Sequence, residues 1–429
     1  MKSDFYKQVA DVAVPQALQS LVQNSFGVID QVMIGQLGVT AIAAVGFASK
    51  YVSIFTTVLT AASAGLGIFA AQYAGRNERT KTASLTGRMI LVSVSICLTI
   101  CILSMIFPVM KLYTEDAAFQ ASSYLWIAIW SLPFTAINLF LSVVLRCYGH
   151  AKEPFYASAV GIILNTVLNA LFIFGFGWQL FGAALATVLT QGVSALIVIL
   201  YCRRYIPWVY KYERMAVSGL AKVIVPLAMA DFLWSLGENV YVMVYGHTTL
   251  NASAAMTMTI PVQSLVIGLL SGFAGAAGIL VGKDLGQGDK EAALEHSRIL
   301  MRLSAIGSIL LFILLLIAAP FYVRIYSVSD DVRSICIGLL AAFGAMSIVK
   351  VQNMVLGGGI LRAGGHTGEL LAIDMIGTWL AGVPLAFLGL HLFGTNIILI
   401  YLLLSQEEVL RCILCLIMYH RRKWMTRLS

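Results

Sequence analysis

The chain has 429 residues, of which 59% are hydrophobic and only 11% charged, whereas soluble domains average about 25% charged residues. With a mean hydropathy of +0.88, this composition excludes a soluble globular protein. The net charge of +8 could indicate a nucleic-acid-binding protein, but the placement of the basic residues argues against that class.

Apolar segments of about 20 residues, the length of a membrane-spanning helix, follow one another along the whole chain. We therefore expect an all-α membrane protein with about twelve transmembrane helices and no separate soluble domain. The predicted spans are 12–34, 47–73, 89–110, 122–147, 155–176, 180–202, 223–245, 255–282, 299–323, 334–361, 370–392 and 395–418.

The first of these segments contains a carboxylate, Asp30, in an otherwise apolar run. A charged side chain at membrane depth is costly, so it is a functional candidate. In the fifth segment Asn165 and Asn169 are four residues apart and share a helix face. Because buried amides need partners, Asp30 and these amides could form a site for Na⁺ or a proton. Alternatively, the asparagines only join one helix to another.

The basic connection 203–222 divides the chain into two halves of six segments each. We predict an N-terminal lobe of residues 1–202 and a C-terminal lobe of residues 223–429, which ends in a short basic tail. Because six is an even number, both halves enter the membrane in the same direction. The sequence therefore predicts parallel repeats, related by an axis along the membrane normal.

The two halves repeat one sequence frame. The frame around Pro15 recurs around Pro226, 211 residues later. A second motif, Leu-Arg followed closely by Gly-His, occurs at Arg146 and again at Arg362, 216 residues later. Two matches in the same order and at nearly equal spacing indicate an internal duplication.

The second half has ionisable residues of its own within apolar segments. Asp231 and Glu238 lie about two turns apart on the seventh segment, and Lys350 lies near the middle of the tenth. Lys350 could neutralise either carboxylate, as a structural ion pair or as part of coupling. The offset of 211 makes Tyr241 the counterpart of Asp30, so the halves differ in charge placement.

Other polar residues in or near the apolar segments are expected to be structural. Lys50 and Asp374 lie near predicted helix ends, where long side chains can reach the interface at little cost. Cys412 and Cys415 have a metal-like spacing but no second pair. We therefore expect no metal site other than a possible Na⁺ site at Asp30.

The basic residues predict the topology. If the N-terminus is inside, the inner segments and the tail hold most of the lysines and arginines, Arg411 among them. The outer segments hold only Lys111, Arg324 and Arg333. This positive-inside bias predicts that both termini are cytoplasmic. The lipid bilayer, rather than nucleic acid, then accounts for the net charge.

Several motifs taken together resemble the multidrug and toxic compound extrusion (MATE) family, most closely its bacterial DinF-like branch. These motifs are Ile29-Asp30-Gln31, Ala71-Gln72-Tyr73-Ala74-Gly75, Asn165-Thr166-Val167-Leu168-Asn169 and Asp231-Phe232-Leu233-Trp234. The resemblance covers nearly the whole chain. It implies two six-helix lobes around a central cleft that opens alternately to each side, and export of organic cations or other amphipaths against inward Na⁺ or H⁺ flow.

The resemblance also implies roles for individual residues. Asp30 matches the first-helix acid that takes the coupling ion, and Asn165 matches its amide partner on the fifth helix. Asn169 stands where some members have a second acid, so this lobe has one carboxylate fewer than theirs. Asp231 falls near a seventh-helix acid of other branches, and we count Glu238 and Lys350 as further candidates.

We therefore predict a secondary antiporter, without a cofactor and without enzymatic activity, that acts as a monomer in the bacterial cytoplasmic membrane. Its expected partners are amphipathic, mainly cationic small molecules and the coupling cation. One alternative is a flippase or exporter of a lipid-linked or saccharide intermediate, which needs a wider basic cleft than Lys50 and Lys350 provide. Another is a membrane-embedded enzyme, for which the sequence shows no acid pair, metal constellation or nucleophile–base set.

Overall fold

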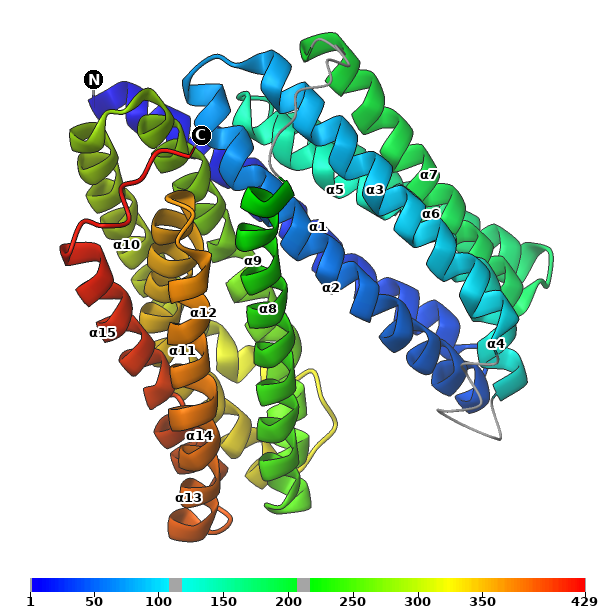
Figure 1. Cartoon of the computed structure of the whole chain (residues 1–429). Coiled ribbons are helices and arrows are strands. Elements are labelled where there is room, and N and C mark those ends of the chain that lie inside the picture. The colour runs from blue at the N-terminus through cyan, green and yellow to red at the C-terminus, as the bar shows by residue number, and fades with distance from the viewer. Residues whose placement is uncertain (1, 108–117, 207–216, 429) are drawn as a thin grey trace. The chain divides into compact units, whose positions relative to one another are not determined.

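The computed structural model describes residues 2–107, 118–206 and 217–428, and every regular element within these ranges is helical (Figure 1). The helices of the first half are α1 (Lys2–Gly35), α2 (Val39–Gly75), α3 (Arg79–Ile106), α4 (Ala118–Ala128), α5 (Ser131–Cys147), α6 (Lys152–Asn169), the π-helix η2 (Ala170–Gly175) and α7 (Gln179–Tyr205). Those of the second half are α8 (Val217–Gly246), α9 (Leu250–Gln287), α10 (Lys290–Val323), α11 (Asp330–Val355), the π-helix η3 (Leu356–Leu361), α12 (Thr367–Met375), the π-helix η4 (Ile376–Gly382), α13 (Val383–Phe393), α14 (Ile397–Leu404) and α15 (Gln406–His420).

The predicted class, an all-α membrane protein, is confirmed. Within the described residues, nine helical stretches are long and apolar enough to cross a membrane, and the bent pair α4–α5 makes a tenth. The first predicted segment corresponds to α1 and the twelfth to α14 with α15. Neither passes the same test of length and composition. In α1 amide side chains and Asp30 lower the hydropathy. The break at Ser405 leaves α14 with 8 residues and α15 with 15, each shorter than a membrane span.

Several segments predicted as single helices are interrupted. Segment 122–147 consists of α4 and α5, which are bent by 42°. Pro133, which has no backbone N–H to donate, therefore falls in the first turn of α5, where none is needed. The thiol of Cys101 lies 3.3 Å from the carbonyl oxygen of Ile129 at the break. Segment 395–418 is likewise broken, at Ser405.

The chain divides into two compact units, one of Leu18–Val217 and one of Met1–Ala17 with Ser218–Ser429. The first half of α1 thus packs with the C-terminal unit and its second half with the N-terminal unit. The predicted boundaries at 202 and 223 stay predictions, because half of the connection 203–222 lies outside the described residues.

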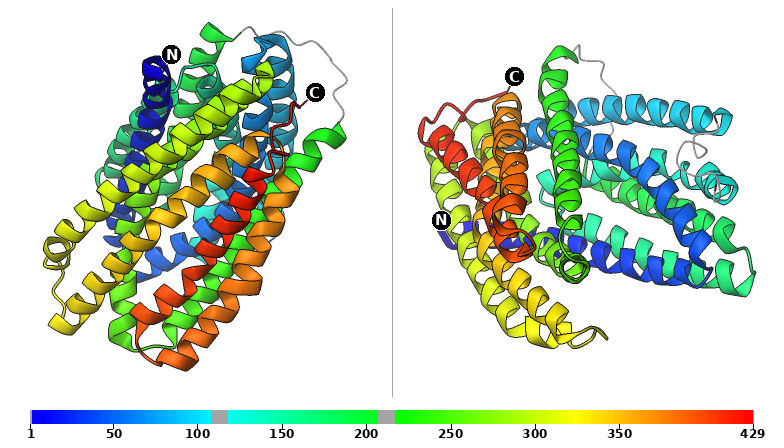
Figure 2. Two further views of the ribbon diagram at one scale, coloured as in Figure 1. Left: turned by 90° about the vertical axis from the view of Figure 1, so that its left-hand side faces the viewer. Right: turned by 90° about the horizontal axis from the view of Figure 1, so that it is seen from below.

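Small residues allow close helix packing within the C-terminal unit. Gly359 of η3 lies against the backbone of α9 at Ala274 and Gly278, and α15 runs along α11 and α12 (Figure 2). A Cβ added at Gly359 would lie 2.7 Å from the carbonyl oxygen of Ala274, whereas at Gly358, the preceding residue, it would meet nothing within 4 Å. The two neighbouring glycines therefore differ in their surroundings.

We expect Gly359→Ala to destabilise the protein by about 1–3 kcal/mol, because the added methyl group overpacks an interface between two backbones. Gly358→Ala is the matched control and should leave the midpoint of thermal unfolding unchanged or slightly raised, since alanine restricts the unfolded chain. Unfolding of the purified protein in detergent measures both. Equal effects of the two substitutions would contradict the close approach at Gly359.

Candidate functional site

The structure brings together the three residues predicted to form a site in the N-terminal unit. The side-chain nitrogen of Asn169, at the end of α6, lies 2.7 Å from Asp30 Oδ1 on α1. The same nitrogen lies 2.8 Å from Asn165 Oδ1, one turn earlier on α6. An amide has two hydrogens to donate, so Asn169 can donate to both oxygens at once. Asn165 and Asn169 are buried, at 2% and 0% exposure.

One oxygen in this group remains without a partner. Asn169 Oδ1 is buried and accepts no hydrogen bond from the residues that the structure describes. An unsatisfied buried acceptor is unfavourable, and amide and carboxylate oxygens are the ligands that hard cations prefer. The Asp30 carboxylate and Asn169 Oδ1 together could therefore hold Na⁺, or Asp30 alone could take a proton.

The helix that carries the two asparagines changes geometry directly after them. Asn169 is the last residue of α6, and the π-helix η2 begins at Ala170. π-turns are rare and occur often at functional sites. Near the same site, the buried Tyr124 on α4 interacts electrostatically with Asp30. Sequence reasoning missed Tyr124, because an aromatic residue in an apolar segment carries no distinguishing signal.

A second set of polar contacts joins the helices of the N-terminal unit. Arg146 on α5 donates to Gln19 Oε1 on α1 at 2.8 Å, and Gln19 donates to Ser158 Oγ on α6 at 2.7 Å. In the C-terminal unit the repeat counterpart of Arg146 is Arg362, which interacts electrostatically with Asp231 on α8. In both units the arginine at this point therefore interacts with a polar residue of the half's opening helix, Gln19 on α1 or Asp231 on α8.

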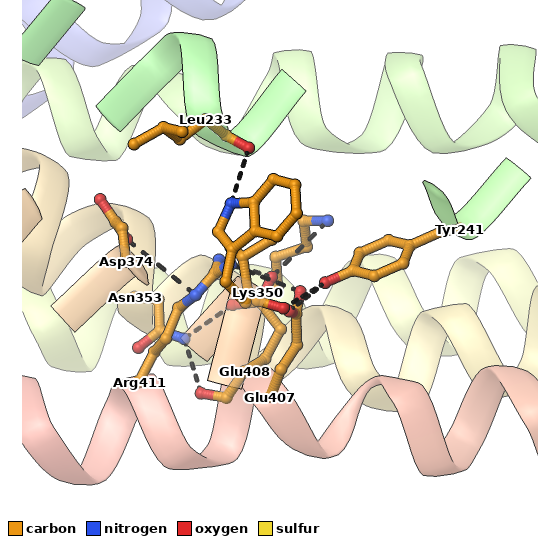
Figure 3. A network of polar contacts seen from close by, with 10 residues as sticks. Leu233, Tyr241, Lys350, Asn353, Asp374, Glu407, Glu408 and Arg411 are labelled. Carbon is orange, nitrogen blue, oxygen red and sulfur yellow. Dashed lines mark hydrogen bonds and ion pairs between the residues drawn. The ribbon is translucent and has the colours of Figure 1, made fainter. Parts of the chain in front are cut away.

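The C-terminal unit contains a denser polar network, centred on α15 (Figure 3). Arg411 lies 3.5 Å from Glu407, 3.7 Å from Glu408 and 4.0 Å from Asp374 on α12. It also donates to the hydroxyl of Thr378 in η4. Arg411 and the two glutamates are each less than 10% exposed. A single buried guanidinium thus faces three carboxylates.

Residues from α8 and α11 complete the network. Lys350 Nζ lies 3.7 Å from Glu408 Oε1, and Asn353 donates to Glu408 Oε2 at 2.8 Å. On the other side, the hydroxyl of Tyr241 donates to Glu407 Oε2 at 2.5 Å. Figure 3 shows Tyr241 and Lys350 pointing toward the two glutamates from different helices. These contacts bring α8, α11 and α15 together at one place.

Three expectations about the second half need correction. The ion pair of Lys350 is with Glu408, because α11 packs along α15, and Glu238, one of the two expected partners, acts on Lys350 only from further away. Asp374 does not simply reach toward the interface, since it lies beside Arg411.

Arg411, counted from the sequence among the inner basic residues, is buried: its side chain is 8% exposed and lies among carboxylates. The sequence held a signal for this network. Segment 395–418 contains two adjacent glutamates and an arginine, and the rule that intramembrane ionisable residues are functional candidates applies to them as it does to Asp30.

Comparison with known proteins identifies the family of this chain. The family model MatE matches residues 15–171 and 226–388, more than half of the chain. The chain belongs to the MatE family. The two matches begin 211 residues apart, the same offset as the repeated frame. MatE proteins are membrane transporters, so the chain belongs to a family of transporters.

Curated relatives and solved structures agree with this assignment. "Probable multidrug resistance protein NorM" of Thermotoga maritima is 26% identical, covering 98% of this chain and 93% of its own. The "FAD transporter" of Shewanella oneidensis is 21% identical, covering 91% and 90%. A crystal structure of a MATE protein in complex with MaL6 has a TM-score of 0.89 at 18% identity, covering 98% of this chain and 96% of the other.

A MOP superfamily transporter from Pyrococcus furiosus has a TM-score of 0.88 at 18% identity and covers 98% and 96%. At this identity the structural likeness establishes the fold. The predicted twelve-helix architecture is therefore confirmed by the fold as well as by the family.

We expect Arg411→Met to destabilise the protein by about 3–5 kcal/mol, because removing one partner of a buried ion pair leaves uncompensated charge. Adding Glu407→Gln restores the net charge of the network and should recover part of this loss. Thermal unfolding in detergent is the measurement. Arg333→Met, which removes an exposed ion pair with Asp330, is the control and should have little effect. A small effect of Arg411→Met would contradict the network.

Proposed function

We propose that the protein is a secondary antiporter that exports amphipathic, mainly cationic small molecules, driven by Na⁺ or H⁺ that binds at Asp30. The observation that carries this proposal is the hydrogen bond from Asn169 to Asp30, together with the buried amide oxygen of Asn169, which has no hydrogen-bond partner among the described residues. Several relatives are named multidrug resistance proteins, and these names favour the same class of substrate.

The proposed coupling follows from the hydrogen bond between Asn169 and Asp30. A hydrogen bond to a charged carboxylate is roughly twice as strong as one between neutral groups. When Asp30 takes a proton or shares its charge with Na⁺, it holds Asn169 less tightly. Asn169 adjoins the π-helix η2, a rare geometry that is frequent at functional sites. Ion binding at Asp30 can therefore bias the conformation of the second half of this membrane segment.

Antiport requires that the ion and the substrate stabilise different states of the transporter, because a ligand with equal affinity for both states shifts nothing. In this proposal the ion favours the state in which Asp30 is neutralised, and a cationic substrate favours the state in which Asp30 keeps its charge. The two ligands then exclude each other through one carboxylate.

The charges of the C-terminal unit favour this proposal over export of a lipid-linked intermediate. A phosphate-bearing headgroup needs unpaired cations in the cleft. Lys350, one of the two deep lysines considered for that role, is already paired with Glu408.

We further propose that the protein acts as a monomer in the bacterial cell membrane. Both termini then lie in the cytoplasm, in accord with the positive-inside bias.

The test is transport of an organic-cation dye by purified protein in liposomes, first under a Na⁺ gradient and then under a pH gradient. Asp30→Asn should abolish gradient-driven export, because the neutral amide can neither take up a proton nor offer a negative charge to Na⁺. Asp11→Asn is the matched control on the same helix, at an exposed position, and should transport like the wild type. The gradient that drives export identifies the ion.

Two outcomes would overturn the proposal. Folded wild-type protein that moves no dye under either gradient would exclude cation export and make lipid-linked substrates the next candidates. Normal gradient-driven export by Asp30→Asn would show that coupling does not depend on this carboxylate.

A further inference from the structure

The network around α15 contains more carboxylates than cations. Glu407, Glu408 and Asp374 share two basic partners, Lys350 and Arg411. In the wider surroundings, Arg362 acts on Asp374, but it also faces a further acid, Asp231, so it does not remove the excess. Glu238 on α8 adds another acid within electrostatic range of Lys350. A buried, unbalanced carboxylate is costly unless it takes a proton.

The contacts indicate which carboxyl group carries the excess. Glu408 has Lys350 and Arg411 at 3.7 Å and a hydrogen bond from Asn353. Among the described residues, Glu407 has one cation within 4 Å, Arg411, which it shares with two other acids, and the hydroxyl of Tyr241; Lys350 acts on it from further away. Of the two buried glutamates, Glu407 is therefore the one with less cationic compensation, although it is only 4% exposed.

The surroundings of Glu407 can accommodate a proton without moving a helix. When Glu407 is charged, the hydroxyl of Tyr241 donates to its Oε2 at 2.5 Å. The carbonyl oxygen of Thr378 lies 3.5 Å from the same hydroxyl. When Glu407 is protonated, Tyr241 can turn its hydrogen to Thr378 and accept the new hydrogen bond from Glu407. Rotation of one hydroxyl thus satisfies both protonation states.

The π-helix η4 is shaped around this group. A Cβ at Gly382 would overlap Glu407 Oε2 and the hydroxyl of Tyr241, and one at Gly377 would overlap the side chain of Arg411. Glycine at these two positions leaves the space that the carboxyl and guanidinium groups occupy. The π-helix also contains Thr378, whose hydroxyl accepts from Arg411 and whose carbonyl oxygen lies 3.5 Å from the hydroxyl of Tyr241.

Repeat symmetry connects this group with Asp30. Tyr241 stands 211 residues after Asp30, at the corresponding place in the repeated frame. In the N-terminal unit the first helix supplies the acid, and an amide of another helix donates to it. In the C-terminal unit the first complete helix supplies the donor, Tyr241, and the last helix supplies the acid, Glu407.

We propose that Glu407 is a second proton-binding site of this transporter, in which the carboxyl group takes a proton from water and Tyr241 redirects its hydrogen to Thr378. The ligand is a proton rather than Na⁺, because Arg411 and Tyr241 present hydrogens to Glu407 and leave few free oxygen lone pairs for a metal ion. The coupling role of this site rests on the proposed antiport, but its proton binding does not.

The titratable and charged groups that act on Glu407 are Tyr241 and Tyr245 on α8, Lys350 on α11, and Glu408 and Arg411 on α15. Further groups act on these neighbours: Glu238 on α8, Asp374 on α12, Tyr401 on α14 and, through Asp374, Arg362. Of these groups, only Tyr241 is changed in the variants tested below. The other charges around residue 407 are therefore the same in the wild type and in each variant.

The test is infrared difference spectroscopy of the purified protein in lipid nanodiscs between acid and alkaline pH, with the proton as the probe. Glu407→Gln should remove one protonated-carboxyl band per molecule, and Asp30→Asn should leave that band in place. Tyr241→Phe should shift its frequency, because the protonated carboxyl loses a hydrogen-bond partner. Glu369→Gln, at a side chain 61% exposed, is the matched control and should leave the band unchanged.

An unchanged spectrum in folded Glu407→Gln would overturn this inference, as would loss of the same band in Asp30→Asn. Dye export keeps the two proposals apart. If Asp30→Asn abolishes export while Glu407→Gln changes neither export nor the spectrum, antiport stands and the second site falls. If the wild type exports no dye but the band is present and lost in Glu407→Gln, the site stands and antiport falls.

Discussion

A carboxylate within a membrane-spanning helix must find partners inside the protein, and this requirement governs both polar sites of the chain. Lipid offers neither water nor ions, so each buried charge needs a donor, a cation or a proton. Asp30 has an amide donor, and Glu408 has a lysine, an arginine and an amide. The helices that carry these residues are held in register by the contacts that compensate them.

The two halves meet this requirement in different ways, although they share one ancestry. The N-terminal site is nearly neutral in its surroundings, with two asparagines around a single acid. The C-terminal network has many charges, and its arginine and lysine are fixed among glutamates. A site with one acid and a free amide oxygen suits an exchangeable ion. A network whose cations are built into the chain suits a proton, because its donors already occupy the carboxylate oxygens.

Much of the fold could be predicted because hydrophobic segment length and the repeated frame are local properties of a sequence. The N-terminal site could also be predicted, since Asn165 and Asn169 share a helix face and Asp30 is isolated in an apolar run. The partner of Lys350 could not, because it depends on which helix packs against α11. The sequence offers two nearby acids on α8, and the structure selects one on α15.

The helix breaks are a further limit of prediction. A hydropathy pattern does not distinguish a straight span from one that bends near Pro133 or stops at Ser405. No sequence pattern predicts the π-helices either, yet η2 adjoins Asn169 and η4 contacts Glu407 and Arg411. The local geometry of both sites therefore follows from tertiary packing, which cannot be derived from a single amino-acid sequence.

The central claim is that ion and substrate exclude each other through the charge of Asp30. The most direct measurement is the release of bound ion from purified protein when an organic cation is added, followed as H⁺ in weakly buffered detergent solution and as Na⁺ with an ion-selective electrode. The account predicts release from the wild type and none from Asp30→Asn. Equal release from both proteins would contradict it.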